Sequence, residues 1–214
     1  MEKSLKITEI FYSLQGESNT VGLPTVFIRL TGCPLRCSYC DTAYAFSGGE
    51  RQTISSIIEQ VDSFKAKYIT ITGGEPLAQA DCHDLMTRLL DKGYKVSLET
   101  SGALDISLVD SRAVKVMDLK TPASAEMDKN NYQNIEFLSE KDQVKFVIAD
   151  NKDYEWSKSM IRQYDLDNRC EILFSPVMGQ YNPTVLAENI IRDNLPVRFQ
   201  IQLHKYLWDD AQGK

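Results

Sequence analysis

Residues 25–42, Thr-Val-Phe-Ile-Arg-Leu-Thr-Gly-Cys-Pro-Leu-Arg-Cys-Ser-Tyr-Cys-Asp-Thr, join an apolar, strand-like run to three closely spaced cysteines. Cys33, Cys37 and Cys40 follow the spacing C-x3-C-x2-C. An electron-transfer [4Fe–4S] cluster normally takes four thiolates, so three thiolates leave one iron without a protein ligand. A catalytic zinc site keeps one position open in the same way, so that a small molecule can bind there. The stretch therefore indicates a reaction centre directly after a buried strand.

The same cysteines also fit half of a zinc site, which needs a fourth ligand and usually takes it from a second close pair. The rest of the chain contains Cys82, Cys170, His83 and His204, of which only Cys82 and His83 are adjacent. Disulfides are disfavoured, because five cysteines is an odd number and no secretory segment is evident. The spacing favours a catalytic cluster, with zinc as the alternative.

The bulk composition predicts one ordinary globular domain. The chain has 214 residues, of which 43% are hydrophobic, and its formal net charge is −6. The negative charge disfavours a general nucleic-acid-binding surface, and no apolar run has the length of a membrane span. We therefore expect a cytoplasmic protein with neither nucleic acid nor membrane as a partner.

Apolar runs rich in β-branched residues alternate with helical patterns along the chain. The expected strands are residues 25–30, 68–72, 95–99, 114–119, 144–149, 171–177 and 197–203. The expected helices are residues 54–64, 85–90, 154–164 and 184–191. Nearly uninterrupted apolar runs are typical of parallel strands that are buried on both faces. The pattern predicts a single α/β domain with a mainly parallel sheet.

Polar residues follow several of these expected strands at their carboxyl ends. The cysteines follow residues 25–30, Gly73-Gly74-Glu75-Pro76 follows residues 68–72, and Thr100-Ser101-Gly102 follows residues 95–99. Asp118 and Lys120 end the fourth expected strand. Because functional groups in parallel α/β folds collect at this edge of the sheet, we expect all of these residues in one site.

With its cysteine spacing and Gly73–Pro76 one strand–helix–strand unit later, the chain resembles the radical S-adenosylmethionine superfamily. The resemblance implies a partial (β/α) barrel that holds a [4Fe–4S] cluster. S-adenosylmethionine would bind the free iron through its amino and carboxylate groups. One electron would then cleave it to methionine and a 5′-deoxyadenosyl radical that abstracts hydrogen from the substrate.

A narrower resemblance rests on five segments, which are residues 11–17 (FYSLQGE), 27–33 (FIRLTGC), 39–42 (YCDT), 99–102 (ETSG) and 202–208 (QLHKYLW). Together they resemble the 7-carboxy-7-deazaguanine synthase family. This resemblance implies conversion of 6-carboxy-5,6,7,8-tetrahydropterin to 7-carboxy-7-deazaguanine with loss of ammonia, on the route to queuosine. It also implies Mg²⁺ as a cofactor, a homodimer, and an electron donor such as flavodoxin or ferredoxin. Residues 1–24 would form a substrate-binding extension, and residues 209–214 a polar tail.

The resemblance also implies roles for individual residues. Cys33, Cys37 and Cys40 would bind the cluster, and Thr42 would bind Mg²⁺. The contacts to S-adenosylmethionine would come from Tyr39, Cys40, Asp41, Gly73, Gly74, Glu75, Gly102, Gln143, Val144 and Lys145. The contacts to the substrate would come from Leu14, Gln15, Gly16, Arg29 and Thr100. Arg29 would bind the substrate carboxylate by a charge-assisted bond, and no side chain is named as a catalytic acid or base.

Other residues and functions stay open at this point. His204 and Lys205 would close the last strand near the substrate, and Cys82 and Cys170 are expected to be structural. One alternative function is a glycyl-radical activase, which shares the cysteine spacing but needs a protein partner. Another is a non-enzymatic [4Fe–4S] electron carrier or a zinc-stabilised module, which needs a fourth ligand from Cys82, Cys170 or a histidine.

Overall fold

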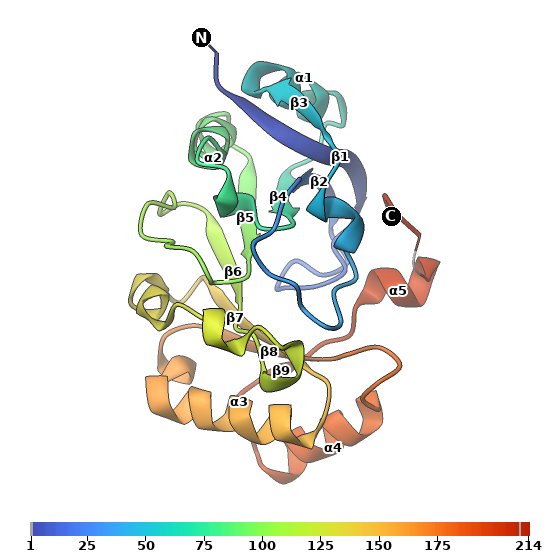
Figure 1. Cartoon of the computed structure of the whole chain (residues 1–214), viewed down its shortest axis with the longest axis vertical. Coiled ribbons are helices and arrows are strands. Elements are labelled where there is room, and N and C mark those ends of the chain that lie inside the picture. Colours follow the sequence, from blue (N-terminus) through green and yellow to red (C-terminus); the bar gives the residue numbers. More distant parts are fainter. Residues whose placement is uncertain (1, 210) are drawn as a thin grey trace.

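The computed structural model describes residues 2–209 and 211–214. Within them the chain forms one nine-stranded sheet in the order β3-β1-β2-β4-β5-β6-β7-β8-β9 (Figure 1). The strands are β1 (Ser4–Leu14), β2 (Pro24–Leu30), β3 (Glu50–Thr53), β4 (Tyr68–Gly73), β5 (Lys95–Thr100), β6 (Val114–Asp118), β7 (Gln143–Ile148), β8 (Glu171–Pro176) and β9 (Arg198–Phe199). β1 pairs antiparallel with β2 and β3, and every pair from β2 to β9 is parallel. The expected mainly parallel α/β sheet is confirmed.

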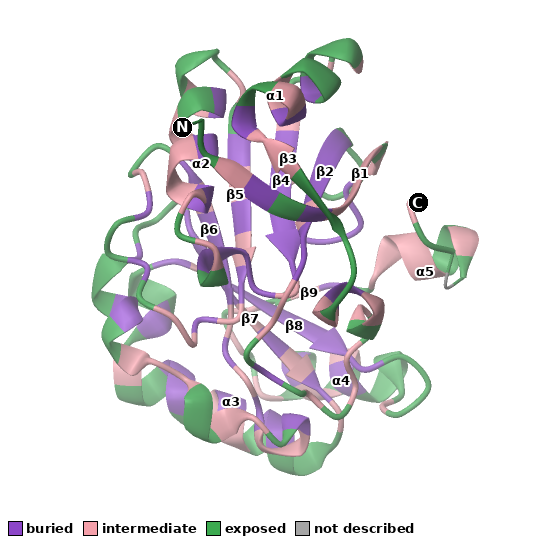
Figure 2. Cartoon of the chain, turned by 45° about the horizontal axis from the view of Figure 1, so that its top comes forward, coloured by how far each residue is buried: buried purple, intermediate pink, exposed green. Residues whose placement is uncertain are grey.

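The helices lie on the outside of this curved sheet (Figure 1). They are α1 (Ile54–Ser63), α2 (Cys82–Asp91), α3 (Asn151–Tyr164), α4 (Pro183–Arg192) and α5 (Leu203–Trp208). The side chain of Thr53 caps α1 by accepting from the Ser56 N–H, and Asp150 caps α3 in the same manner. Figure 2 shows the strands largely buried and the outward faces of the helices exposed. The amphipathic helices α1 to α4 therefore cover the apolar strands and leave the strand ends open for a site, whereas α5, which has no buried residue, lies at that open end.

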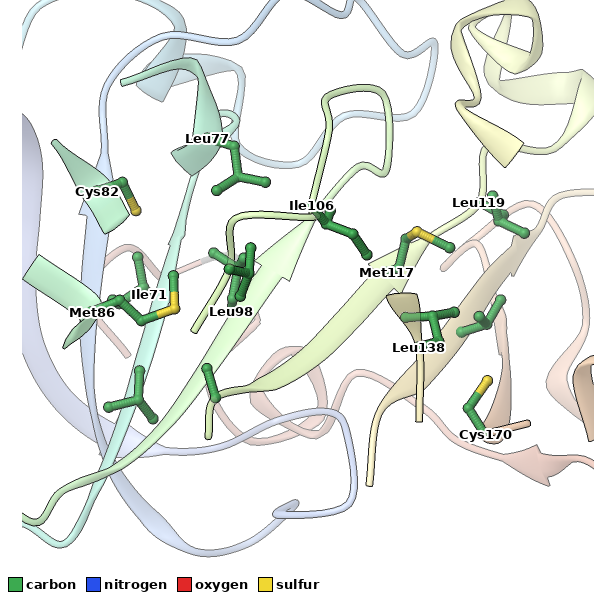
Figure 3. Close-up of a cluster of buried hydrophobic side chains, with 14 of the residues drawn as sticks. Ile71, Leu77, Cys82, Met86, Leu98, Ile106, Met117, Leu119, Leu138 and Cys170 are labelled. Carbon is green, nitrogen blue, oxygen red and sulfur yellow. The ribbon is translucent and has the colours of Figure 1, made fainter. Parts of the chain in front are cut away.

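The apolar side chains form one continuous core between the sheet and the helices. Figure 3 shows part of it, with Met86 of α2, Ile71 of β4 and Leu98 of β5 among the buried residues. Cys82 and Cys170 belong to the same core and are buried. Their surroundings support the structural role expected from the sequence.

The structure differs from the sequence-based expectation in three places. β1 and β3 were not expected, because their residues mix charged and apolar side chains without a continuous apolar run. The expected strand 197–203 is short, since only Arg198 and Phe199 pair with β8. His204 and Lys205 therefore lie on the helix α5 and do not close a strand, which corrects their predicted placement.

The described residues contain no helix that is both long enough and apolar enough to cross a membrane.

Candidate functional site

A cavity of about 460 Å³ opens at the carboxyl ends of the parallel strands. Its volume falls within the range of small-molecule and cofactor sites. The predicted site residues that line it are Leu14, Gln15, Gly16, Arg29, Cys33, Cys37, Tyr39, Cys40, Asp41, Thr42, Gly73, Gly74, Thr100 and Lys145. The predicted residues that do not line it are Glu75, Gly102, Gln143 and Val144. The fold thus brings most of the predicted site together.

The three cysteines of the loop after β2 are free thiols at the cavity wall. The Leu35 N–H donates to Cys33 Sγ at 3.4 Å, and the Cys40 N–H donates to the Cys37 carbonyl oxygen at 3.2 Å. Burial raises the pKa of the Cys33 thiol and raises that of Cys37 to about 11, so these thiols stay protonated until a metal deprotonates them. In the described residues no three His, Cys, Asp or Glu side chains converge on the position of a single metal ion. Three thiolates are the ligand number that leaves one iron of a [4Fe–4S] cluster without a protein ligand.

The glycine pair after β4 allows the backbone to pass close to the cysteine loop. A Cβ on Gly74 would lie 2.0 Å from the Gly32 carbonyl oxygen and 3.1 Å from Cys33 Cβ. A Cβ on Gly73 would lie 2.7 Å from the Leu30 carbonyl oxygen. Only glycine fits at these two positions, and the resulting cradle beside three thiols suits a cluster with a bound small molecule.

The carboxylate of Glu75 is turned into the fold and away from the cavity. Glu75 is 0% exposed and accepts hydrogen bonds from the side chains of Thr100 and Ser101 and from the N–H groups of Ser101 and Leu77. Its side chain therefore braces the ends of β4 and β5. The Thr100 hydroxyl donates to the same carboxylate, so its proton is already used within the fold.

Arg29 of β2 lies at the cavity wall in a network of its own. Its Nε donates to Glu9 Oε1 at 2.7 Å, and the Tyr44 hydroxyl donates to the same oxygen at 2.8 Å. The guanidinium carbon lies 6.0 Å from the centre of the Phe11 ring and 5.8 Å from that of Tyr44. These contacts hold the planar guanidinium in one orientation, which is what recognition of a carboxylate requires.

The segment after β1 forms a second wall. The side-chain amide of Gln15 donates to Thr70 Oγ1 at 3.0 Å and accepts from the Glu17 N–H at 3.1 Å, so it is anchored within the fold. A Cβ on Gly16 would lie 2.2 Å from His204 Nδ1, and the Gly16 carbonyl oxygen accepts from the Leu203 N–H. Glycine at position 16 therefore allows α5 to pack directly on this wall.

Largely buried ion pairs between Glu17, Asp118, Lys120 and Lys145 line the cavity on a further side, which we call its floor. Lys145 Nζ lies 2.7 Å from Glu17 Oε2 and 3.7 Å from Asp118 Oδ2, and Lys120 Nζ lies 2.9 Å from Asp118 Oδ2. Burial disfavours the charged form of Lys145, but Glu17 and Asp118 outweigh it and raise its pKa well above the usual range. Asp118 Oδ1 is buried and has no hydrogen-bond partner within the described residues. Asp118 itself lines the cavity, so this unpaired acceptor lies at the cavity wall.

A polar clasp connects α5 to the site. Lys205 Nζ lies 2.9 Å from Asp41 Oδ2, and Gln202 Nε2 donates to Asp41 at 3.0 Å and to Glu17 Oε1 at 2.8 Å. Burial opposes ionisation of Asp41, but Lys205 and these hydrogen bonds lower its pKa to about 2. Burial lowers the pKa of His204, the neighbouring residue on α5.

Sequence reasoning assigned no role to several residues of the site. They are Glu9, Glu17, Tyr44 and Glu99, whereas Asp118 and Lys120 were expected in the site but without a named role. The sequence did contain a signal for four of these residues. Glu17 and Glu99 are terminal residues of segments that carried the family resemblance, and Asp118 and Lys120 end an expected strand. Glu9 and Tyr44 had none, because they meet Arg29 only through the pairing of β1 with β2 and the fold of the cysteine loop.

Comparison with known proteins agrees with this geometry. Residues 27–118 match the model of the radical SAM superfamily. The 7-carboxy-7-deazaguanine synthase of Chlorobaculum tepidum is 44% identical, over 99% of this chain and 98% of its own length. The enzyme of the same name from Koribacter versatilis is 39% identical, over 95% of this chain and 97% of its own.

Solved structures show the same fold. The crystal structure of QueE from Escherichia coli superposes with a TM-score of 0.78 at 23% identity, covering 94% of this chain and 95% of that one. Streptococcus suis SuiB bound to S-adenosylmethionine superposes with a TM-score of 0.56 at 14% identity, covering 80% of this chain and 48% of that one. Full-length identity of this size, together with the cysteine loop and cradle, leads to one conclusion: this chain belongs to the 7-carboxy-7-deazaguanine synthase family of radical SAM lyases.

Proposed function

We propose that this chain converts 6-carboxy-5,6,7,8-tetrahydropterin to 7-carboxy-7-deazaguanine with release of ammonia, in the biosynthesis of queuosine and related 7-deazapurines. The observation that carries the proposal is the shared cavity, in which three free thiols lie at one wall and the oriented Arg29 guanidinium at another. A reactive centre and an anchor for a small anion thus border the same space. The full-length relatives that bear the enzyme's name support the assignment.

The donor set fits a [4Fe–4S] cluster on Cys33, Cys37 and Cys40. When bound, the cluster and S-adenosylmethionine supply a 5′-deoxyadenosyl radical that removes hydrogen from the substrate. The chain's own part is to hold these groups and exclude water. Gly73 and Gly74 leave room beside the thiols for the amino-acid end of S-adenosylmethionine, and Tyr39, Cys40 and Asp41 border the same space.

A further contact to S-adenosylmethionine is assigned to Lys145 of the cavity floor. Lys145 lines the cavity and keeps its charge, so it suits a carboxylate. The other four residues predicted to contact S-adenosylmethionine, Glu75, Gly102, Gln143 and Val144, do not line the cavity, and we propose that they position the residues that do. Gln143, for example, donates to Glu171 from a buried position.

The pterin would lie on the side of Arg29. Arg29 pairs with the substrate carboxylate, and the segment Leu14-Gln15-Gly16 borders the ring. Phe11 and Phe27 stack with centroids 4.9 Å apart and also line the cavity, so they offer an aromatic face to a flat heterocycle. Because the Thr100 hydroxyl is engaged by Glu75, we assign its substrate contact to the main chain.

Mg²⁺ is part of the proposal through Thr42, which lines the cavity next to the cysteine loop. A single hydroxyl oxygen from the protein suits this ion, since it keeps several waters and takes its remaining ligands from the substrate. The ion would orient the substrate carboxylate and offset charge that develops on it.

The partners follow from the same proposal. We expect a homodimer, with flavodoxin or ferredoxin as the electron donor, and a cytoplasmic location. A fourth cysteine ligand, as an electron carrier requires, is disfavoured because Cys82 and Cys170 lie in the apolar core and do not line the cavity. His204 lines the cavity but packs against Gly16 on the wall formed by the segment after β1. The oriented Arg29 in a small cavity disfavours an activase, whose substrate is another protein.

The test is an anaerobic turnover. The protein is reconstituted with iron and sulfide, and S-adenosylmethionine, dithionite, Mg²⁺ and 6-carboxytetrahydropterin are added before mass spectrometry of the products. Formation of 7-carboxy-7-deazaguanine supports the proposal. A fully loaded protein that cleaves S-adenosylmethionine but leaves the pterin unchanged would refute the substrate assignment and keep the radical chemistry.

A further inference from the structure

The middle of the cysteine loop is held by a segment that contains no cysteine. Residues 121–126 (TPASAE), which we call the support segment, follow β6 in the chain and contact the loop between its second and third cysteines. The Ser38 hydroxyl donates to the Ala123 carbonyl oxygen at 2.6 Å, and the Ser38 N–H donates to the Ser124 carbonyl oxygen at 3.0 Å. Two hydrogen bonds from one residue thus fix the loop between Cys37 and Cys40.

Two further contacts lie on either side of Ser38. The Arg36 N–H donates to Glu126 Oε1, and the Tyr39 hydroxyl lies 3.3 Å from Thr121 Oγ1. These contacts use main-chain groups, hydroxyls and a carboxylate, and the three cysteines of the loop are free thiols. The support segment can therefore position the loop while all three thiols stay available for a cluster.

The support segment is itself firmly fixed in the fold. Thr121 and Ser124 are buried, and the Thr121 hydroxyl donates to the Val147 carbonyl oxygen of β7 at 3.1 Å. Ala125 has a φ of 63°, a left-handed conformation that is unfavourable for a residue with a Cβ. Backbone strain of this kind persists only where the surroundings enforce it, and it is common at functional sites. Here it lies in the segment that contacts the cysteine loop.

A buried carboxylate on α3 ties the support segment to β7. Asp153 is 0% exposed, and one of its oxygens accepts from the Ala123 N–H at 2.9 Å while the other accepts from the Ala149 N–H at 3.0 Å. In the described part of the chain Asp153 forms no ion pair, and Lys158 of the same helix pairs with Asp193 instead. The first turn of α3 and the two N–H groups offset the charge of Asp153. The buried charge thus joins two backbone segments.

We propose that the support segment is a template that presets the cysteine loop before a cluster is assembled, and that Asp153 is the positioning residue of this template. Ala123 is the link, because its carbonyl oxygen accepts from Ser38 and its N–H donates to Asp153. Groups behind metal ligands orient those ligands, and ligands that are already in place lose less freedom on binding. The inference rests on the cluster that the radical SAM family implies and is independent of the pterin substrate.

Only a carboxylate can accept from both N–H groups at once. Asp153→Asn keeps the size and shape of the side chain, but it replaces one acceptor oxygen with an NH₂ donor that would face an N–H group. One of the two hydrogen bonds is then lost, and a backbone N–H is left without its partner. The support segment should loosen, and Ser38 should move with it.

The first measurement is hydrogen exchange of the apoprotein, followed amide by amide by NMR. In the wild type we expect the Arg36 and Ser38 amides to be protected without iron, because both donate to the support segment. In Asp153→Asn these two amides should exchange roughly tenfold faster, since the loop opens more often. Protection in the strands of the sheet should stay at the wild-type level.

The second measurement is the rate at which a chelator removes iron from the reconstituted protein. Asp153→Asn should release iron roughly tenfold faster than the wild type, and the EPR signal of its reduced cluster should broaden. Ser38→Ala should do the same, although Ser38 does not touch α3, and Ser38→Thr should restore slow release because it keeps the hydroxyl. The double variant Ser38→Ala/Asp153→Asn should be no faster than the faster single variant, since both act through Ala123.

Asp193→Asn is the matched control for a general loosening of α3. Asp193, at the end of α4, accepts from the Tyr154 hydroxyl at 2.9 Å and from Lys158 Nζ at 2.6 Å, so it holds α3 without touching the support segment. This variant should unfold at lower denaturant concentration but keep the wild-type amide protection at Ser38 and the wild-type rate of iron release. If Asp153→Asn does not fold, Ser38→Ala and Ser38→Thr carry the test.

Three results would overturn the inference. The first is a wild-type apoprotein whose Arg36 and Ser38 amides exchange as fast as those of an unfolded peptide, because the loop would then not be preset. The second is wild-type iron release in Asp153→Asn or in Ser38→Ala. The third is iron release in Asp193→Asn as fast as in Asp153→Asn, which would reduce the role of Asp153 to general stability. No pterin enters these measurements, so a failure here is distinct from a failure of the proposed function.

Discussion

Replacing Gly74 with alanine should displace the cysteine loop. The new Cβ would lie 2.0 Å from the Gly32 carbonyl oxygen and 2.5 Å from its carbonyl carbon. Real Cβ contacts are essentially never shorter than 3.0 Å, so the two backbones must separate by about 1 Å. Gly32 directly precedes Cys33, and its carbonyl oxygen also accepts from the Glu75 N–H at 2.8 Å. The displacement therefore reaches the first cluster ligand and the brace behind it.

The cost of this change has two parts. Overpacking of this kind typically lowers the free energy of unfolding by about 1–3 kcal/mol. A misplacement of about 1 Å at a reactive centre reduces turnover by roughly 100-fold. We expect Gly74→Ala to unfold at lower denaturant concentration, to bind less than the full iron content, and to lose most of its cleavage of S-adenosylmethionine.

The assays are chemical denaturation of the apoprotein, iron per chain after reconstitution, and anaerobic turnover. Gly93→Ala is the control, because Gly93 has a positive φ of 87° but a Cβ there would meet nothing within 4 Å. It should lose about 1–2 kcal/mol from the left-handed backbone alone and load iron normally. Full iron loading and normal turnover in Gly74→Ala would refute the argument from close approach.

Three further predictions concern the anchor, the ion and the stability. Arg29→Lys should raise KM for the pterin by roughly 10- to 100-fold with a smaller change in kcat, because lysine cannot form a bidentate pair; an unchanged KM in steady-state kinetics would contradict the anchor. Thr42→Val should raise the Mg²⁺ concentration that gives half activity by roughly tenfold, and an unaltered Mg²⁺ titration would remove Thr42 from the ion's shell. Asp142→Asn should lower the free energy of unfolding by roughly 3–5 kcal/mol, because it leaves the buried Lys115, now 3.0 Å from Asp142, without its partner. Burial opposes ionisation of Asp142, yet its hydrogen bonds and Lys115 hold its pKa below 3.8. The stabilisation by this ion pair is therefore present above pH 3.8, and it is lost as the pH falls through the lower pKa that Asp142 has in the folded protein. Denaturation midpoints across that range check it, with the exposed Asp128→Asn as a control that should change little.

Local sequence determined much of this protein. Apolar runs such as residues 68–72 and 171–177 lie in the sheet as expected, because a strand buried on both faces needs little more than continuous apolar side chains. The cysteine spacing and the glycine pair indicated a reactive centre at the strand ends, since parallel strands bring their carboxyl ends to one edge. These properties depend on residues that are close in sequence.

Tertiary structure alone decided how the charges are distributed. Sequence analysis expected Glu75 to contact S-adenosylmethionine and gave Glu99 no role. In the structure Glu75 faces inward to Thr100 and Ser101, while Glu99 lines the cavity and its carboxylate has no ion-pair or hydrogen-bond partner among the described residues. Glu9 reaches Arg29 only because β1 pairs antiparallel with β2. The mixed polar and apolar pattern of β1 did not predict that this segment is a strand. The expected strand 197–203 is reduced to Arg198–Phe199, and the chain then continues into α5, which packs on Gly16 almost 190 residues away in sequence. Whether a carboxylate meets a cation depends on which face of the strand its side chain takes and on which distant segment pairs with that strand. A short local run of residues does not determine the pairing partner.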